Sequence, residues 1–425
     1  MVEAIAMANS QTDDRRRDSV FKEECYKTPQ AQRKTNDPDA AHKDSEYYIR
    51  QKLELGVIAD RIAAAWVKYT IMGILIVYMY GAMCLKYVSG AQSLYQGIAF
   101  IATGNLGAWD DNKFVYPVSI LVFGFLCIIF SFGDIENSKW LQIISAYSRI
   151  IVMIMMMIGS IYYLGKDGTN TSPVWDWEEQ KNSLATVFGN TVFVFIYHHS
   201  IPGIVYPIRP QAGLGKMFFT ANVVASILLF TEGFLAYLAF SGLNNSCTPP
   251  PGQPTEFPCE VAELYNENFL DIPVLGQICQ FYPMLNVSAV PILTITLRNN
   301  FMQVVPVKRW IRNSGCCKFL LEDHKRSVKG IWSIIFSIPV IIIVMFERDP
   351  QVMISYTGGI CGPFILFLIP VTLVWYGRRK LGEQNENNFN RSPYQAFWLL
   401  VVISIFAFIT LFMALYGAAT GKAGE

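Results

Sequence analysis

The chain has 425 residues, of which 52% are hydrophobic and only 16% are charged, and its formal net charge is +1. Apolar residues this abundant, gathered in long blocks, argue against a soluble protein and indicate a polytopic membrane protein. The balanced charge gives no reason to expect a nucleic-acid partner, and the nine cysteines lack the repeated CxxC spacing of a zinc site. We therefore expect neither a metal nor another cofactor.

The first 63 residues precede any block long enough to cross a bilayer. The opening stretch "MVEAIAMANS" is apolar but too short to span, so we interpret it as the end of a preceding helix. About fifty polar residues of mixed charge follow, and we expect them to form a flexible cytoplasmic segment. Upstream spans are then expected to be missing from this sequence.

Nine later blocks reach the length at which a helix crosses the bilayer core, about 20 apolar residues. They lie at 64–88, 114–132, 140–164, 184–206, 216–240, 273–297, 331–346, 353–376 and 395–416. They predict an all-α membrane domain over residues 64–416, followed by a short outer tail at 417–425.

The third block, 140–164, carries Arg149 well inside its apolar run. A charge at that depth costs at least about 2.5 kcal/mol unless it faces a cavity, an acid or backbone carbonyls. Two interpretations stay open. Arg149 is either a structural clamp between helices or a fixed cation in place of a bound ion, because arginine hardly ever loses its proton.

The fourth block contains the stretch "FIYHHSIPGIVYP", in which a helix is expected to break between His198 and Gly203. Pro202 lacks a backbone N–H and disfavours helical geometry before it, Gly203 loosens the chain, and Ser200 is a good helix-start residue. Irregular backbone at membrane depth is tolerated only where it lines a cavity or is buried in protein. Many secondary transporters form their site in this way, although a simple proline kink is the alternative.

The adjacent His198 and His199 are candidate binding residues within this break. A polar ring in the bilayer interior must face a partner or water. A neutral histidine bonded to a neighbouring carbonyl would instead be purely structural.

The fifth block, 216–240, carries Glu232. A buried carboxyl that titrates near neutrality suits proton coupling, whereas an acid that reaches the outer interface has no such role. Glu232 and Arg149 lie at different heights along their spans, so we do not expect them to pair directly.

The loop at 241–272 has five acidic residues and no lysine or arginine, whereas residues 308–329 carry seven basic residues and "GRRK" occupies 377–380. Basic loops stay in the cytoplasm, so the N-terminal segment is predicted to be cytoplasmic and the 241–272 loop lumenal or extracellular. That loop also contains a glycosylation sequon at Asn244 and two cysteines, Cys247 and Cys259, which suit a disulfide on that side. A chance sequon and two free thiols are the alternative.

Several of these stretches, taken in order, resemble one known family. "VFGNTVFVFIYHHSIPGIVYPIRP" is similar to the sixth helix of the amino acid/auxin permease family. "NVSAVPILTITLRNN" at 286–300 resembles its eighth helix, "SYTGGICGPFILFLIPVTLVW" at 355–375 its tenth, and "IVYMYGAMCLKYVSG" at 76–90, with Tyr80, its third. The segments 199–202 and 297–300 look most like a poorly characterised branch that is grouped as transmembrane proteins similar to neutral amino acid transporters.

The resemblance implies eleven spans, arranged as two inverted five-helix repeats and one extra helix, with helices one and six broken at the substrate site. The nine spans present would be helices three to eleven, so helix one, half of the site, is absent. Either the sequence is truncated, which we favour, or the protein as given cannot complete that pocket.

The resemblance also implies which residues bind. The implied substrate-binding residues are Phe195, Tyr197, His198, His199, Ser200, Tyr80 and Asn286, and the implied ion-coupling residues are Arg149, Glu232 and Ser288. Val287 and Ala289 replace the hydroxyls expected beside Pro291 at a sodium site, which weakens sodium coupling.

The sequence therefore predicts a secondary active transporter that moves amino acids or similar small zwitterions across a bilayer by alternating access, with protons as the candidate coupling ion. The alternative is a membrane amino acid sensor or scaffold with the same fold that does not transport. We do not expect an enzyme, because no nucleophile or acidic metal ligand accompanies the two histidines. The plasma membrane and endolysosomal or vesicular membranes are equally compatible with the sequence.

Overall fold

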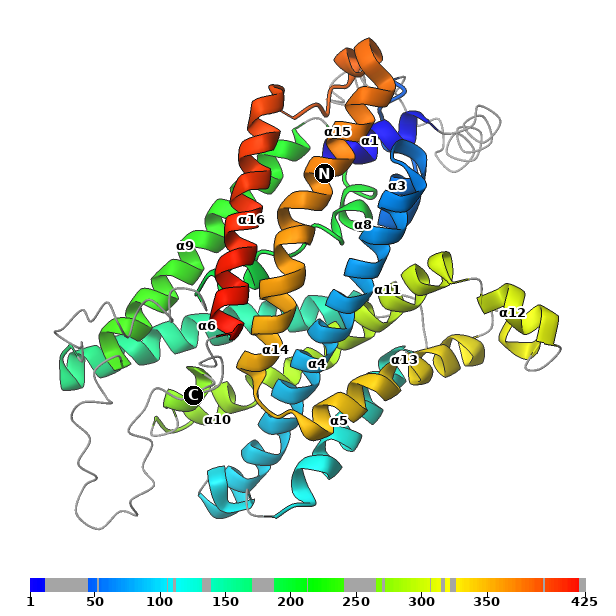
Figure 1. Cartoon of the computed structure of the whole chain (residues 1–425). Helices are drawn as coiled ribbons and strands as arrows, with labels where there is room; N and C mark the ends of the chain where they lie inside the picture. Colours follow the sequence, from blue (N-terminus) through cyan, green and yellow to red (C-terminus); the bar gives the residue numbers. More distant parts are fainter. Residues whose placement is uncertain are drawn as a thin grey trace, which may run out of the picture. The chain divides into compact units, whose positions relative to one another are not determined.

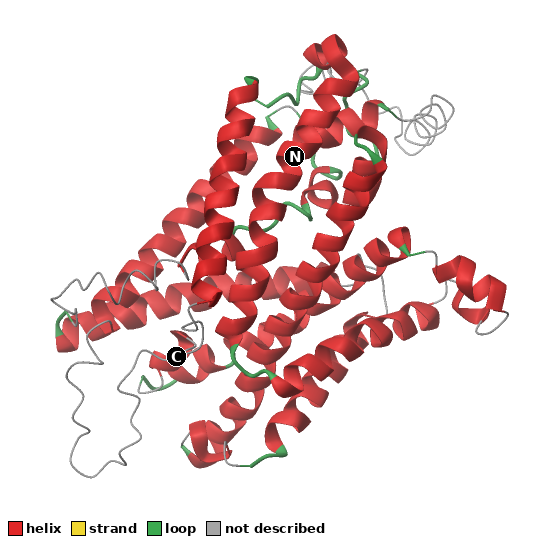
Figure 2. Cartoon of the chain, viewed as in Figure 1, coloured by secondary structure: helices red, strands yellow, loops and turns green. Residues whose placement is uncertain are grey.

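The structure is a computed structural model of the chain, drawn in Figure 1. It describes residues 1–11, 45–51, 53–104, 106–109, 112–131, 139–169, 187–211, 213–240, 265–269, 272–305, 307–314, 318–321, 326–392 and 394–419. This described part consists of helices and connecting loops, with no strand (Figure 2). The predicted all-α class is confirmed.

Seven of the described helical segments are long and apolar enough to cross a membrane. They are Ala65–Thr103, Gln142–Lys166, Leu214–Phe240, Leu275–Met302, Ser327–Phe346, Pro350–Asn387 and Phe397–Tyr416. The predicted block at 114–132 forms the shorter apolar helix Val115–Ser131, and the block at 184–206 is broken. Each of the nine predicted blocks thus has a helical counterpart, as expected of a polytopic membrane protein.

The first span extends well beyond its prediction, because α4, Ala65–Thr103, continues for fifteen residues after the predicted end at 88. Hydropathy marks where a segment matches the bilayer, whereas a helix continues until its backbone is interrupted. Residues 89–103 contain no proline. The helix ends at Gly104, whose φ of +74° is the left-handed conformation of a helix C-terminus, with its N–H bonded to Phe100 O at 2.9 Å.

The chain forms two compact units, and each is described by itself. Unit 1 comprises residues 1–78, 185–223 and 355–421. Its elements are α1 (Val2–Ser10), α3 (Leu55–Ile62), α4 up to Tyr78, a helix at 187–194, α8 (Ile201–Val205), the start of α9 (Leu214–Phe240), the π-helical turns η7 (Thr357–Cys361) and η8 (Phe364–Leu368), α15 (Ile369–Leu381), η9 (Gly382–Asn387) and α16 (Phe397–Ala419).

The short helix α1 is buried within unit 1. Met7 lies so close to Gly377 of α15 that a Cβ added there would be 2.6 Å from Met7 Cε. Glu3, 2% exposed, accepts hydrogen bonds at 2.8 Å from both Nε and Nη2 of Arg378. The carboxylate also accepts one from Asn385 Nδ2 at 3.1 Å and one from the Ser392 N–H at 2.9 Å.

Part of the segment predicted to be flexible is also packed in unit 1. The Gln211 side chain bonds both backbone groups of Ile49, accepting from its N–H at 2.8 Å and donating to its carbonyl at 2.7 Å. The helix α3 follows shortly after. Residues 12–44 of the predicted flexible segment lie outside the described residues.

Unit 2 comprises residues 79–184, 224–354 and 422–425. Its elements are α4 from Met79, η1 (Leu106–Trp109), α5 (Val115–Ser131), α6 (Lys139–Asp167), α9 from Val224, η4 (Tyr265–Phe269), α10 (Leu275–Gln280), η5 (Tyr282–Ser288), α11 (Ala289–Val304), α12 (Val307–Ser314), η6 (Lys318–Leu321), α13 (Arg326–Phe346) and most of α14 (Pro350–Tyr356).

Aromatic and small residues form the core of unit 2. Phe123 of α5 lies edge-on to Tyr87 at 5.7 Å between ring centroids and fills the space beside Gly90 of α4. Phe269 of η4 fills the corresponding space beside Gly159 of α6. A second cluster holds α6, α9 and α10 together through Val152, Met156, Ala239, Phe240, Phe269 and Cys279.

Candidate functional site

The predicted break in the fourth block is present in unit 1. The helix at 187–194 ends before Phe195, and α8 begins only at Ile201. The interruption therefore covers residues 195–200, three residues earlier than the predicted 198–203. Pro202 and Gly203 lie inside α8, where the missing proline N–H costs nothing because the first N–H groups of a helix are unpaired anyway.

Tyr78 of α4 lies beside the break. Its ring centroid is 5.3 Å from that of His199 and 6.5 Å from that of Phe193. The sequence pointed to Tyr80 instead, which lies two residues further along α4 and belongs to unit 2. Two residues along an α-helix turn the side chain by about 200°, so Tyr80 does not share the face of Tyr78. Tyr78 could not be identified from the sequence, because its contact with His199 joins residues far apart in the chain.

Tyr197 occupies the middle of the break. Its ring centroid lies 4.9 Å from that of His198 and 6.2 Å from that of Phe218 of α9. Its hydroxyl accepts a hydrogen bond from Asn222 Nδ2 at 2.6 Å. Asn222 could not be singled out from the sequence, because a single amide on an apolar helix is most often structural.

The two histidines each carry a buried nitrogen without a hydrogen-bond partner. Nδ1 of His198 and Nδ1 of His199 meet no donor or acceptor among the described residues. A buried polar atom left unpaired costs about 1–3 kcal/mol, which a bound water or solute can recover. We call this group the imidazole site; its members are Tyr78, Phe193, Tyr197, His198, His199 and Asn222.

Glycines hold the helix before the break against the π-helical turns. A Cβ on Gly358 would lie 2.7 Å from the Gly189 carbonyl oxygen and 2.6 Å from Phe193 Cβ. One on Gly362 would lie 2.5 Å from Val192 Cγ1. The backbones approach closely because these positions lack side chains, and π-helical turns often occur at functional sites.

A polar cluster lies in unit 2, where the sixth predicted span is wound as a 3₁₀ helix over η5 instead of continuing as an α-helix. The Leu285 carbonyl accepts a hydrogen bond from Arg149 Nη2 at 3.2 Å. Ser288 Oγ lies 2.8 Å from the same carbonyl and 2.7 Å from Ser145 Oγ. We call this group the Leu285 cluster; its members are Ser145, Arg149, Leu285 and Ser288.

Lys86 of α4 is a charged residue that the sequence analysis did not single out. It lies in unit 2, and the positive charge of Arg149 acts on it. The predicted block ended at 88, two residues after Lys86, whereas α4 continues to Thr103 and places Lys86 well within the helix. A lone lysine in an apolar helix was the available signal.

The remaining predicted residues are not gathered at one place. Phe195 and Ser200 lie in the break of unit 1. Asn286 lies in η5, beside the Leu285 cluster in sequence, and Glu232 lies on α9; both belong to unit 2. No ion pair between Glu232 and Arg149 is found in the described part of the chain. Asn244, Cys247 and Cys259 lie outside the described residues.

No group of three or more His, Cys, Asp or Glu residues in the described ranges is placed to hold a metal ion. The interactions found at the imidazole site are aromatic packing and the hydrogen bond between Asn222 and Tyr197.

Residues 44–243, slightly less than half of the chain, match the family described as transmembrane amino acid transporter protein. The chain is also similar over most of its length to proteins called Transmembrane protein 104. It is 24% identical over 460 residues to the one from Homo sapiens, covering 96% of this chain and 86% of that protein. The homolog from Dictyostelium discoideum is 24% identical over 383 residues, covering 87% and 72%. The homolog from Caenorhabditis elegans is 22% identical over 462 residues, covering 98% and 86%.

The family match includes the break at 195–200 and all six residues of the imidazole site. The name of the relatives states only that they cross a membrane. The resemblance predicted from the sequence is therefore confirmed: residues 44–243 match the transmembrane amino acid transporter family, and the chain is similar over almost its whole length to the Transmembrane protein 104 proteins.

Proposed function

We propose that this protein is a secondary active transporter of amino acids or similar small zwitterionic solutes, and that it works by alternating access in the inverted-repeat fold of its family. The observation that carries the proposal is the interruption at 195–200 together with the unpaired Nδ1 atoms of His198 and His199. Broken helices expose backbone groups to a solute without a buried charge, which is how many secondary transporters bind substrate at membrane depth.

The composition of the imidazole site supports a zwitterion as the substrate. Its six residues carry no carboxylate, lysine or arginine, so a solute with a net charge would find no opposite charge there. A neutral imidazole offers one donor and one acceptor, and a tyrosine hydroxyl offers both. These groups suit a carboxylate and an ammonium on the same small molecule, while the rings of Tyr78 and Phe193 pack against its apolar part.

The Leu285 cluster supports protons rather than sodium as the coupling ion. The Arg149 guanidinium donates a hydrogen bond to the Leu285 carbonyl oxygen. That oxygen is one of those that a 3₁₀ turn could otherwise offer to a metal cation. Arginine keeps its charge at all physiological pH values, so this position holds a permanent positive charge. A sodium ion beside it would be repelled.

The decisive test is uptake by the full-length protein reconstituted in liposomes. We expect labelled neutral amino acids to accumulate against their gradient when a proton gradient is imposed, and no acceleration by a sodium gradient. Empty liposomes and a protein with His198→Phe and His199→Phe are the controls. Saturable binding without accumulation under any gradient would contradict transport and support a membrane amino acid sensor with the same fold.

The charge distribution supports an orientation with residues 12–44 in the cytoplasm and the 241–272 loop on the lumenal or extracellular side. Glycosylation of Asn244 and a disulfide between Cys247 and Cys259 are part of this proposal.

A further inference from the structure

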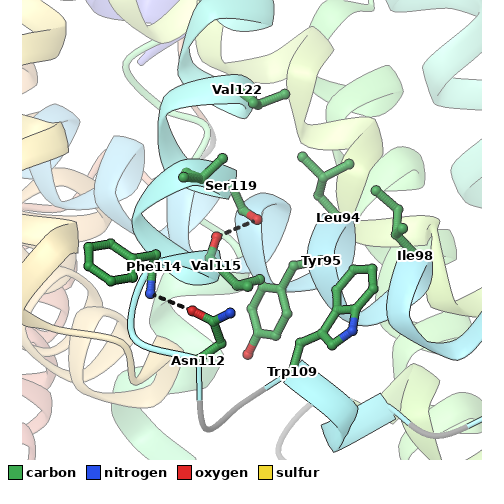
Figure 3. Close-up of a pocket in the computed structure, with 10 residues that line it drawn as sticks. Leu94, Tyr95, Ile98, Trp109, Asn112, Phe114, Val115, Ser119 and Val122 are labelled. Atoms are coloured by element: carbon green, nitrogen blue, oxygen red, sulfur yellow. Dashed lines mark hydrogen bonds between the residues drawn. The ribbon is translucent and has the colours of Figure 1, made fainter. Parts of the chain in front are cut away.

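A groove of about 440 Å³ lies within unit 2, between the end of α4 and the start of α5 (Figure 3). The turn of η1 closes one end. Its walls are formed by Tyr95 and Ile98 of α4, Trp109 of η1, and Val118 and Val122 of α5, with Asn112 at the same end as Trp109. A volume of this size lies in the range of small-molecule sites, about 300–1,000 Å³.

The open side of the α4–α5 groove is apolar and exposed. Ile98 is 45% exposed, Val118 54% and Val122 46%. On helices of a membrane domain, exposed branched apolar side chains face lipid hydrocarbon, because water at that surface would be costly. The occupant of the groove is therefore a bilayer component and not a water-soluble metabolite.

The lining of the groove indicates what kind of lipid headgroup fits. None of its ten lining residues is charged, and Lys113, between Asn112 and Phe114 in the chain, is not part of the lining, so a phosphate would not be neutralised inside the groove. Asn112 Oδ1 accepts a hydrogen bond from the Phe114 N–H at 3.1 Å, which fixes the side chain with its amide nitrogen available as a donor. A single neutral hydroxyl is the headgroup that such a site accommodates.

The aromatic rings favour a rigid lipid. Tyr95 of α4 and Trp109 of η1 both line the groove (Figure 3). A fused-ring ligand presents a flat face to these side chains and loses little conformational freedom on binding, whereas an acyl chain must give up several rotamers. We propose that the α4–α5 groove binds a membrane sterol, with its hydroxyl at Asn112 and its rings against Tyr95 and Trp109.

The test uses the full-length protein in lipid nanodiscs that contain a trace of a sterol with a photoreactive diazirine on its ring system. We expect the probe to label peptides from α4 and α5. In the Val118→Trp variant, whose indole fills the groove, this labelling should fall at least about fivefold. Leu121→Trp is the matched control: Leu121 lies on the same helix, is 52% exposed and does not line the groove. Its labelling should equal that of the wild type.

Two further measurements keep the proposal falsifiable if the tryptophan variant misfolds. Asn112→Leu preserves volume but removes the amide, and it should weaken competition by unlabelled sterol about tenfold, as expected for one lost hydrogen bond. Excess diacylglycerol, a lipid with a hydroxyl but with flexible chains, should not displace the probe. Equal labelling of both tryptophan variants, or equal displacement by diacylglycerol, would overturn the assignment of a sterol.

Discussion

Two kinds of buried polar side chain occur in unit 1, and they differ in what their polar atoms meet. Glu3 is paired with Arg378, Asn385 and the Ser392 N–H. The Nδ1 atoms of His198 and His199 meet no partner in the described part of the chain. Satisfied groups stabilise the native state, whereas unsatisfied ones cost stability unless a ligand completes them. This contrast separates residues that hold the fold from residues available to a solute.

We predict that His199→Phe removes uptake while leaving the fold intact. Phenylalanine preserves the ring contact with Tyr78, at 5.3 Å in the wild type, but removes both nitrogens. One lost hydrogen bond to a bound solute corresponds to roughly a tenfold weaker interaction or more. The measurement is liposome uptake together with the melting temperature in detergent. Unchanged uptake at an unchanged melting temperature would show that His199 is purely structural.

Glu3 should make stability depend on pH. It lies in α1, outside the candidate spans. Burial alone would raise its pKa, but hydrogen bonds from Arg378, Ser392 and Asn385 outweigh burial and hold the pKa below its ordinary value of 4.5. A lowered pKa in the folded state means that the stabilisation is present above the unfolded-state value and is lost as pH falls through the folded-state value.

We therefore predict that Glu3→Gln destabilises unit 1 by about 3 kcal/mol near pH 7, because it leaves Arg378 without its counter-charge. The difference in melting temperature between variant and wild type should shrink as the pH is lowered below 4.5. Asp60→Asn is the matched control, because its ion pair with Lys68 at 2.7 Å is largely exposed and contributes little. A constant difference across the pH range would contradict an ionised Glu3.

The positive charges of Lys86 and Arg149 in unit 2 are expected to repel each other. A second positive charge near Arg149 is unfavourable, because like charges repel and a buried cation needs a counter-charge. Because the charge of Arg149 acts on this position, Lys86→Met should leave the melting temperature equal or higher, while Lys86→Arg should lower it by several degrees. Equal melting temperatures for the two variants would show that Arg149 is too remote to matter.

At the scale of elements, the close packing of the 187–194 helix against the π-helical turns depends on glycine. Gly358→Ala would place a Cβ 2.7 Å from the Gly189 carbonyl oxygen, so the π-helical turn and the 187–194 helix must separate. We expect a loss of about 1–3 kcal/mol and reduced uptake. Gly215→Ala in α9 is the control, because its Cβ would meet nothing within 4 Å and alanine favours a helix by roughly 0.5–1 kcal/mol. A tolerated Gly358→Ala would mean that the two elements can move apart freely.

The sequence predicted elements better than it predicted the details inside them. Long apolar blocks, and proline and glycine near 200, were sufficient for the spans and for the break, because hydropathy and backbone chemistry act locally. The 3₁₀ winding of η5 was not predicted, because nothing in "YPMLNVS" alone distinguishes a 3₁₀ from an α-helical turn. The sequence indicated Asn286 and Ser288 only as candidate binding and ion-coupling residues. Tyr78, Asn222 and Lys86 were missed because their roles depend on neighbours distant in the sequence.

At the scale of the whole molecule, the number of membrane crossings between two loops decides whether the loops lie on the same side of the membrane or on opposite sides. Among the described residues, one candidate span, Leu275–Met302, lies between the acidic loop at 241–272 and the basic stretch that begins at Lys308. We therefore predict that the two loops lie on opposite sides of the membrane, as the retention of basic loops in the cytoplasm would also require. The 3₁₀ turn in this span does not alter the count if the segment crosses completely.

This topology can be tested with short epitopes inserted after Gly252 and after Ser314, each in a separate full-length protein. In intact cells or sealed vesicles, we expect antibody applied from the lumenal or extracellular face to reach the first epitope, and the second only after permeabilisation. Asn244→Gln should also remove a glycan and increase electrophoretic mobility, because only a loop on that side meets the glycosylation machinery. If both epitopes were reached from the same face, the segment at 275–302 would be a re-entrant hairpin around η5. Leu285 would then lie at the tip of a loop, where water would solvate the charge of Arg149 and Arg149 would have no ion to replace.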